Sequence, residues 1–384
     1  MEFLGALVII LIATSLIGHL AARIGIPAVI GQLLVGIVLG PALLNWVHPN
    51  EFIHIFSEIG VIILMFIAGL ESDLTLLKKY LRPSVIVALL GVLVPMALIY
   101  PVGLWFGLTQ FESLFLSVIF AATSVSISVA VMKELNLLDS KSGSTVLGAA
   151  VVDDVLAVVL LSIMVSVMGT TTGSTTQIPL ALTFLEQLIY FVAIYFVVRF
   201  IAPILAKLGT KLLIPVGPTL MAMILCFGMA YIADLIGLSA VIGAFFAGIA
   251  IAQTHVAHEV DQSIEPIGYA IFIPVFFVSI GLNMSLAGIE HDLLLIVVLT
   301  VVATLTKLLG AGSGAKFSGF ALDESYLVGA GMVSRGEMAL IIAQIGYQAK
   351  LISGDYYSAI ITAVILTTLL APFLLKHAAR RINA

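Results

Sequence analysis

Residues 24–31 read IGIPAVIG and residues 236–243 read IGLSAVIG, so six of eight positions are identical at an offset of 212 residues. The same offset places Gly69 on Gly281. Similarity at a fixed offset is how an internal repeat shows in a sequence. Two separate matches at one offset indicate a duplicated unit rather than a chance likeness between apolar segments. The sequence therefore predicts a fold made of two related halves.

The composition indicates a protein whose solvent is a lipid bilayer. Of the 384 residues, 61% are hydrophobic and 10% are charged, whereas a soluble domain has about 25% charged residues. A helix needs about 20 apolar residues to cross a membrane, and the chain contains thirteen such segments. They run approximately over residues 3–22, 27–44, 52–70, 83–106, 112–133, 144–168, 181–206, 217–234, 238–254, 263–282, 291–313, 325–347 and 355–378.

The distribution of Lys and Arg predicts how these segments are oriented. Thirteen of them lie at the ends of odd-numbered segments, and only Lys350 follows an even-numbered one. Because cytoplasmic loops are enriched in Lys and Arg, we expect the C-terminus in the cytoplasm, and the N-terminus and the polar stretch 170–177 outside. The repeat shifts the chain by seven segments, an odd number, so the two halves lie oppositely in the membrane. Inverted repeats are typical of secondary transporters.

Two acidic residues lie where a membrane protein has little reason to place charge. Asp153 and Asp154 stand in GAAVVDDVLAVVLL, residues 148–161 of the sixth segment. They lie about ten residues, or roughly 15 Å, from its cytoplasmic end, which is near the middle of a hydrocarbon core about 30 Å thick. A charge there costs at least about 2.5–3.5 kcal/mol, so such residues are functional candidates. Lys307 is buried in the eleventh segment in the same sense.

Polar residues also interrupt the two repeats at matching positions. The fifth segment contains Thr123 and Ser124, and the twelfth contains Arg335, Gly336 and Glu337. At the offset of 212, Thr123 corresponds to Arg335. Matching interruptions in inverted halves point to a binding site formed by two broken helices. Gly336 explains a break in the twelfth segment, whereas the fifth has no Gly or Pro near its hydroxyl residues.

The adjacent carboxylates suggest a division of labour. Neighbouring side chains on a helix point about 100° apart, so Asp153 and Asp154 cannot face one point equally. We expect one to bind a cation and the other to be held by a positive group, with an Asp153–Lys307 pair as the simplest arrangement. A buried carboxylate that binds either a proton or a cation couples the two ions by competition. Arg335 and Glu337 could neutralise each other or stabilise the ends of broken helices.

Several stretches together resemble the monovalent cation:proton antiporter-2 family, most closely its NapA-type sodium/proton antiporters, over essentially the whole chain. The matching stretches are PAVIGQLLVGIVLGPALL (27–44), EIGVIILMFIAGLESDL (58–74), AATSVSIS (121–128), LGAAVVDDV (147–155), Lys307 and MVSRGEMALIIAQIG (332–346). The aspartate pair is the specific element, because the glycine-rich stretches alone are weak signals.

The resemblance implies a role for each site residue. It implies four ion-binding residues, with Na⁺ at the first of them: Asp154, Asp153, Thr123 and Ser124. It implies that Lys307 forms a salt bridge with Asp153 and takes part in proton coupling. It also implies support for the second broken helix from Arg335, Gly336 and Glu337.

The fold that the resemblance implies is an all-α membrane protein with thirteen transmembrane helices, inverted six-helix repeats and two crossed broken helices, as in NhaA and NapA antiporters. The whole chain, residues 1–380, would be one polytopic unit. Its dimerisation domain would comprise approximately residues 1–82 plus 181–285, and its core domain approximately 83–180 plus 286–380. Relatives are homodimers whose core moves like an elevator.

The predicted function is electrogenic exchange of Na⁺ or Li⁺ for protons across the cell membrane, with membrane lipid and a second copy as partners and no cofactor or nucleic acid. A K⁺/H⁺ antiporter of the same family is an alternative, although such proteins usually have glutamine at the position of Asp153. A sodium-coupled symporter is another, and the buried Lys307 counts against it. A channel is a third. No nucleophile–base set or phosphate-binding motif indicates an enzyme.

Overall fold

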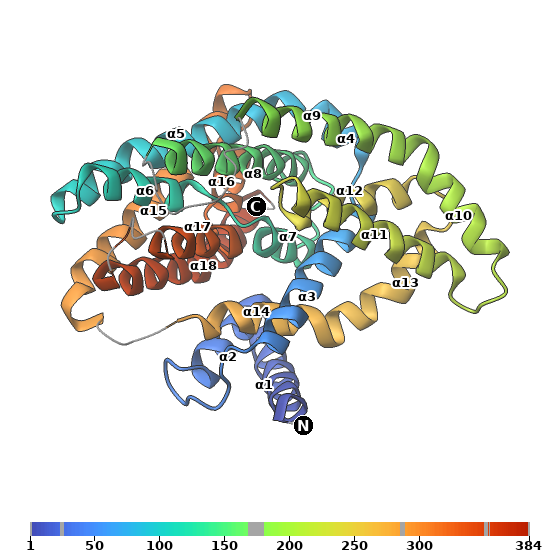
Figure 1. The fold of residues 1–384 in the computed structure, drawn as a ribbon, viewed down its shortest axis with the longest axis horizontal. Coiled ribbons are helices and arrows are strands. Elements are labelled where there is room, and N and C mark those ends of the chain that lie inside the picture. The colour runs from blue at the N-terminus through green and yellow to red at the C-terminus, as the bar shows by residue number, and fades with distance from the viewer. Residues whose placement is uncertain are drawn as a thin grey trace. The chain divides into compact units, whose positions relative to one another are not determined.

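The computed structural model describes residues 2–23, 27–167, 180–284, 289–348, 352 and 354–382, and every regular element within these ranges is helical (Figure 1). Ten helices or helical runs are long and apolar enough to cross a membrane. Three of the thirteen predicted segments fall outside this set: two are the shorter apolar helices Ala28–Leu39 and Ala240–Ala252, and one is the interrupted twelfth segment. The chain is therefore an all-helical membrane protein, and the count of thirteen spans stays a prediction.

The helices divide into two compact units, residues 1–54, 77–170 and 277–384 (unit 1) and residues 55–76 and 171–276 (unit 2). The helices of unit 1 are α1 (Glu2–Arg23), α2 (Ala28–Leu39), α5 (Leu81–Trp105), α6 (Gln110–Ala121), α7 (Val125–Glu134), α8 (Lys141–Val167), α15 (Ile289–Phe317), α16 (Leu322–Gly331), α17 (Glu337–Gln348) and α18 (Gly354–Ile382). Those of unit 2 are α9 (Leu180–Phe196), η1 (Val197–Ile201), α10 (Ala202–Lys211), α11 (Gly217–Leu235), α12 (Ala240–Ala252), α13 (Ala257–Ile267) and η2 (Gly268–Phe272). Three helices begin in one unit and end in the other: α3 (Glu51–Leu70), α4 (Leu74–Lys79) and α14 (Ile273–Leu282).

The internal repeat reappears in the positions at which helices begin. α6 begins at Gln110 and α16 at Leu322, and α7 begins at Val125 and α17 at Glu337. Both pairs differ by the 212 residues read from the sequence. The local capping is repeated as well, because the backbone N–H groups of Thr109 and Ala321 each donate to the carboxylate of the glutamate three residues later. The repeat is thus a duplication of helix register and not only of residue letters.

The conserved spacing of glycines between the halves produces two equivalent helix crossings, one in each unit. In unit 1, a Cβ on Gly36 of α2 would lie 2.2 Å from the Val278 carbonyl oxygen and 2.9 Å from Gly281 Cα of α14. In unit 2, a Cβ on Gly248 of α12 would lie 2.1 Å from the Phe66 carbonyl oxygen and 2.9 Å from Gly69 Cα of α3. Gly36 corresponds to Gly248 and Gly69 to Gly281 at the offset of 212. Small residues allow membrane helices to approach this closely, where tight packing replaces the hydrophobic effect.

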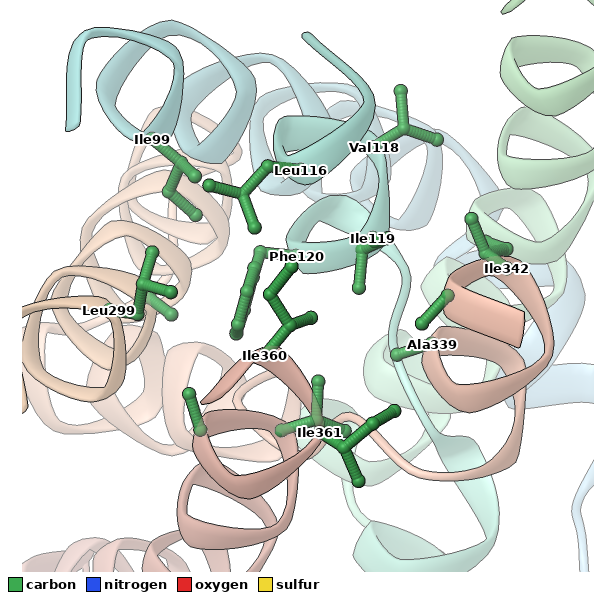
Figure 2. Close-up of a cluster of buried hydrophobic side chains, with 14 of the residues drawn as sticks. Ile99, Leu116, Val118, Ile119, Phe120, Leu299, Ala339, Ile342, Ile360 and Ile361 are labelled. Atoms are coloured by element: carbon green, nitrogen blue, oxygen red, sulfur yellow. The ribbon is translucent and has the colours of Figure 1, made fainter. Parts of the chain in front are cut away.

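Within unit 1, a cluster of apolar side chains surrounds the end of α6 (Figure 2). Leu116 and Phe120 of α6 meet Ile99 of α5, Leu299 of α15 and Ile360 of α18. Phe120 is fully buried. This packing gives the polar residues beyond Phe120 a surrounding of low dielectric constant, in which unsatisfied polar groups are costly and satisfied ones are strongly held.

Candidate functional site

The fifth predicted segment is interrupted immediately after the apolar cluster. α6 ends at Ala121, residues 122–124 are extended, and α7 begins at Val125. Ala122 has φ −62° and ψ 144°, and Ser124 has φ −93° and ψ 118°. Serine and threonine side chains compete with the backbone for hydrogen bonds and so weaken a helix. The interruption turns the Thr123–Ser124 backbone into polar groups that need partners outside their own helix.

The twelfth predicted segment is interrupted at the matching place. α16 ends at Gly331 and α17 begins at Glu337, so that residues 332–336 form a non-helical link. Ser334, Arg335 and Gly336 lie in this link and are buried. Each interruption exposes carbonyl groups at the end of one half-helix and N–H groups at the start of the next.

The two links are bonded to each other. The N–H of Ser124 donates to the Ser334 carbonyl oxygen (2.8 Å), and Ser334 Oγ donates to the Ser124 carbonyl oxygen (2.7 Å). Gly336 makes this approach possible, because a Cβ there would lie 2.6 Å from Ser124 Oγ and 2.9 Å from its Cβ. The predicted break residues Ser124 and Gly336 are therefore in direct apposition.

A buried hydroxyl group adds a second connection between the links. Ser128 Oγ, on the first turn of α7, donates to the Gly331 carbonyl oxygen at the end of α16 (2.6 Å). It also lies 2.9 Å from Ser334 Oγ. Ser128 and Ser334 were not among the predicted site residues. The hydroxyl-rich stretch 121–128 and the position of Ser334 next to Arg335 were the signals that could have indicated them.

Arg335 satisfies three carbonyl groups from three segments of the chain. Its Nε donates to Phe120 of α6 (2.8 Å), Nη1 to Val333 in its own link (2.9 Å) and Nη2 to Ala303 of α15 (2.8 Å). The side chain is fully buried, and its guanidinium carbon lies 5.5 Å from the centre of the Phe120 ring. Of the two readings left open, these contacts favour stabilisation of the helix ends. The side chain of Glu337 lies outside the described part of the structure.

The predicted Asp153–Lys307 pair is present. Lys307 Nζ lies 3.3 Å from Asp153 Oδ1, and both residues are fully buried. Lys307 Nζ also donates to Thr123 Oγ1 (2.5 Å). In the described part of the chain, Asp153 Oδ2 has no hydrogen-bond partner. The ammonium group is therefore shared between a carboxylate of α8 and a hydroxyl group of the first break.

Asp154 follows Asp153 on α8 and is also buried, with 4% of its surface exposed. The site thus contains two carboxylates, Asp153 and Asp154, and two cationic groups, Lys307 and Arg335, all in unit 1. Burial of an ion pair is tolerated only when hydrogen bonds complete it, and here Thr123 and the three carbonyl groups do so. The structure brings together residues that the sequence separates by about two hundred positions.

Comparison with known proteins gives this architecture a family. The family described as "Sodium/hydrogen exchanger, transmembrane" matches residues 7–381. The chain belongs to the sodium/hydrogen exchanger family. A Na⁺/H⁺ antiporter of Enterococcus hirae is 54% identical to this exchanger over 384 residues, which is 100% of both chains. The Na⁺/H⁺-K⁺ antiporter GerN of Bacillus cereus is 44% identical over 98% of this chain and 96% of its own.

A solved structure supports the fold of this exchanger. The sodium proton antiporter MjNhaP1 of Methanocaldococcus jannaschii has a similar structure with a TM-score of 0.67, covering 98% of both chains. Its sequence is 19% identical, so the likeness concerns the fold alone. The helical architecture is thereby that of a known antiporter.

Proposed function

We propose that this protein is a membrane Na⁺/H⁺ antiporter in which Asp154 binds the cation and the proton in turn. The observation that carries this proposal is the buried pair Asp153–Asp154 on α8, placed beside two interrupted helices that are bonded to each other. A relative that is 54% identical over its full length is named a Na⁺/H⁺ antiporter. The protein is thus a transporter and not an enzyme.

The charges of the site explain how exchange is coupled. Two carboxylates and two cationic groups balance when all four are ionised. An additional Na⁺ at Asp154 therefore brings an uncompensated positive charge into a medium of low dielectric constant, where it is costly. Release of a proton from the site removes that charge. Competition for one carboxylate then suffices to exchange the two ions without other chemistry.

The test is proton flux in vesicles that contain the purified protein, with Na⁺, Li⁺ or K⁺ added in turn. Asp154→Asn cannot exchange a proton, so we expect cation-dependent flux to vanish while the protein still folds. Asp73→Asn is a matched control, since Asp73 is exposed and its Oδ1 only accepts from the Thr75 N–H at the start of α4. Sodium-dependent flux that persists in Asp154→Asn would contradict the proposal.

The cation series also decides on a second substrate. GerN is named a Na⁺/H⁺-K⁺ antiporter and is 44% identical, which makes K⁺ a specific candidate. The proposed ion-binding residues, Asp154 and Asp153 with the break at Thr123 and Ser124, supply oxygen ligands suitable for any alkali cation. We propose Na⁺ as the main substrate, and a K⁺-driven flux equal to the Na⁺-driven flux would revise this.

We further propose that exchange is electrogenic, with two protons for one Na⁺, as the Asp153–Asp154 pair of NapA-type antiporters implies. Lys307 would pair with Asp153 while the site lacks Na⁺ and lose its proton when Na⁺ binds. Each turnover would then move one net charge, worth about 2.3 kcal/mol per 100 mV. The measurement is the pH gradient at which flux reverses, at a fixed Na⁺ gradient and a clamped potential. A reversal point that does not depend on voltage would establish one-for-one exchange instead.

Orientation, assembly and motion complete the proposal. The Lys and Arg distribution supports a cytoplasmic C-terminus in the plasma membrane, with inverted repeats and thirteen spans. A cysteine at position 174, in a chain lacking Cys226, would then be labelled from outside the cell. We propose a homodimer in which residues 83–180 and 286–380 move against residues 1–82 and 181–285. Position 174 lies outside the described residues.

A further inference from the structure

The shortest contact of Lys307 is with a hydroxyl group and not with its carboxylate. Nζ lies 2.5 Å from Thr123 Oγ1 and 3.3 Å from Asp153 Oδ1. Charged donors form the shorter and stronger hydrogen bonds in proteins. The oxygen of Thr123 is therefore the better placed of the two acceptors, although it carries no charge.

The surroundings leave the ammonium group few other acceptors. Lys307 is fully buried and Thr123 is 2% exposed. On the side of α5, the position of a Cβ on Gly91 would be 3.8 Å from Nζ, so this helix offers the ammonium group no side-chain oxygen there. Thr123 reaches it because residues 122–124 are extended and carry the side chain off the helical path.

We propose that Thr123 is a positioning residue that holds the ammonium group of Lys307 and thereby sets the pH at which exchange begins. This inference rests on the proposed function and deepens it. Whenever the Lys307–Asp153 contact opens, the Thr123 oxygen remains as an acceptor, and the charged form of the lysine keeps one hydrogen bond. Without that oxygen, Lys307 releases its proton at lower pH.

The assignment differs from a role of the Thr123 hydroxyl group as a cation ligand. An oxygen that accepts from an ammonium group at hydrogen-bond distance lies beside a positive charge, which repels Na⁺. Removal of the hydroxyl group should therefore leave the Na⁺ KM at alkaline pH unchanged. A ligand role predicts the opposite, namely a higher KM and an unchanged pH of onset.

The experiment compares Thr123→Val, Thr123→Ala and Thr123→Ser as full-length proteins in vesicles, with flux measured across a pH series and a Na⁺ series. We expect the pH of half-maximal exchange to fall by about one unit in the valine and alanine variants, as the loss of one hydrogen bond to a charged group implies. Thr123→Ser keeps the hydroxyl group and should restore the wild-type pH profile. Thr300→Val is the matched control, because Thr300 is buried and its hydroxyl group donates only to Ile296 of its own helix α15 (2.7 Å).

Two results are distinguishable. A pH of onset that is unchanged or rises in both hydroxyl-free variants overturns the inference, whatever happens to KM, and so does a serine variant that behaves like valine. Should valine prevent folding, alanine and serine alone still decide the matter. Failure of the proposed function would instead appear in the wild-type protein, as an absence of cation-dependent proton flux.

Discussion

The N–H of Ser124 and the carbonyl group of Phe120, which bond to each other in a continuous α-helix, are both bonded to the second broken segment. Ser124 N–H donates to Ser334 (2.8 Å), and the Phe120 carbonyl oxygen accepts from Arg335 Nε (2.8 Å). Each break therefore provides the partners that the other has lost. The interruption of α6–α7 is stable because the second link completes its hydrogen bonds, and unsatisfied backbone groups inside a membrane cost several kcal/mol each.

Arg335→Ala should destabilise the protein strongly. It would leave three buried carbonyl groups without their donor, and each unsatisfied group costs about 1–3 kcal/mol. Arg335→Lys should be intermediate, since an ammonium group lacks the planar fork that reaches several acceptors. Thermal melting in detergent measures the effect.

Arg381→Ala is the matched control for this comparison. Its ion pair with Asp323 (3.0 Å) has side chains that are 57% and 43% exposed, and such pairs contribute about 0–1 kcal/mol. Equal melting temperatures for Arg335→Ala and wild type would show that the three carbonyl contacts do not support the fold.

Ser334→Ala should slow exchange without preventing folding. The substitution removes the Oγ bond to Ser124 and the contact with Ser128 Oγ, but it keeps the backbone bond from Ser124. The loss is about 1 kcal/mol for a typical hydrogen bond, and the two links become less firmly joined. We expect a lower maximal rate and a higher Na⁺ KM in vesicles.

Ser318→Ala serves as the control, because the Ser318 hydroxyl group donates only within its own segment, to Gly314 (2.8 Å). If Ser334→Ala transports at the wild-type rate and KM, the hydroxyl bonds between the links have no part in the function.

Gly36→Ala should lower the melting temperature, because its Cβ would lie 2.2 Å from the backbone oxygen of Val278. Backbone cannot move aside as a flexible side chain can, so α2 and α14 must separate. Gly18→Ala in α1 is the control, since nothing lies within 4 Å of a Cβ there and alanine favours a helix by about 1 kcal/mol over glycine. The reverse order of stability would refute the close crossing.

Glu324 predicts an acid-dependent loss of stability outside the membrane segments. Burial raises the pKa of its carboxyl group, but the Ala321 N–H and the Lys141 ammonium group outweigh burial and hold this pKa below its usual 4.5. Because the folded-state pKa is the lower one, the contribution to stability is present above pH 4.5 and is lost as the pH falls through the folded-state pKa.

Melting of wild type and Glu324→Gln between about pH 6 and pH 3 measures this contribution, given the reference pKa of a glutamate. The two curves should differ at neutral pH and converge in acid. Lys141 lies 2.9 Å from Glu324, so Lys141→Met should reduce the difference. A gap that stays constant with pH would contradict the assignment.

The acid pair and the repeat could be recognised without coordinates. Asp153, Asp154 and Lys307 stand out because charge is rare in apolar segments, and the offset of 212 residues predicted the later correspondence of α6 with α16 and of α7 with α17. The break at Thr123 could not be derived in the same way. No Gly or Pro lies there, and the interruption depends on partners that are more than two hundred residues away.

By itself, the sequence determined that this protein lies in a membrane, that it is duplicated, and which buried charges it carries. These follow from composition and spacing, which act locally along the chain. Only the tertiary structure decided which groups share those charges. Lys307 lies closer to Thr123 than to Asp153, and Arg335 donates to three carbonyl groups. The physical reason is that a buried polar group takes whichever partner the packing brings within about 3 Å, and packing brings together segments that are remote in sequence.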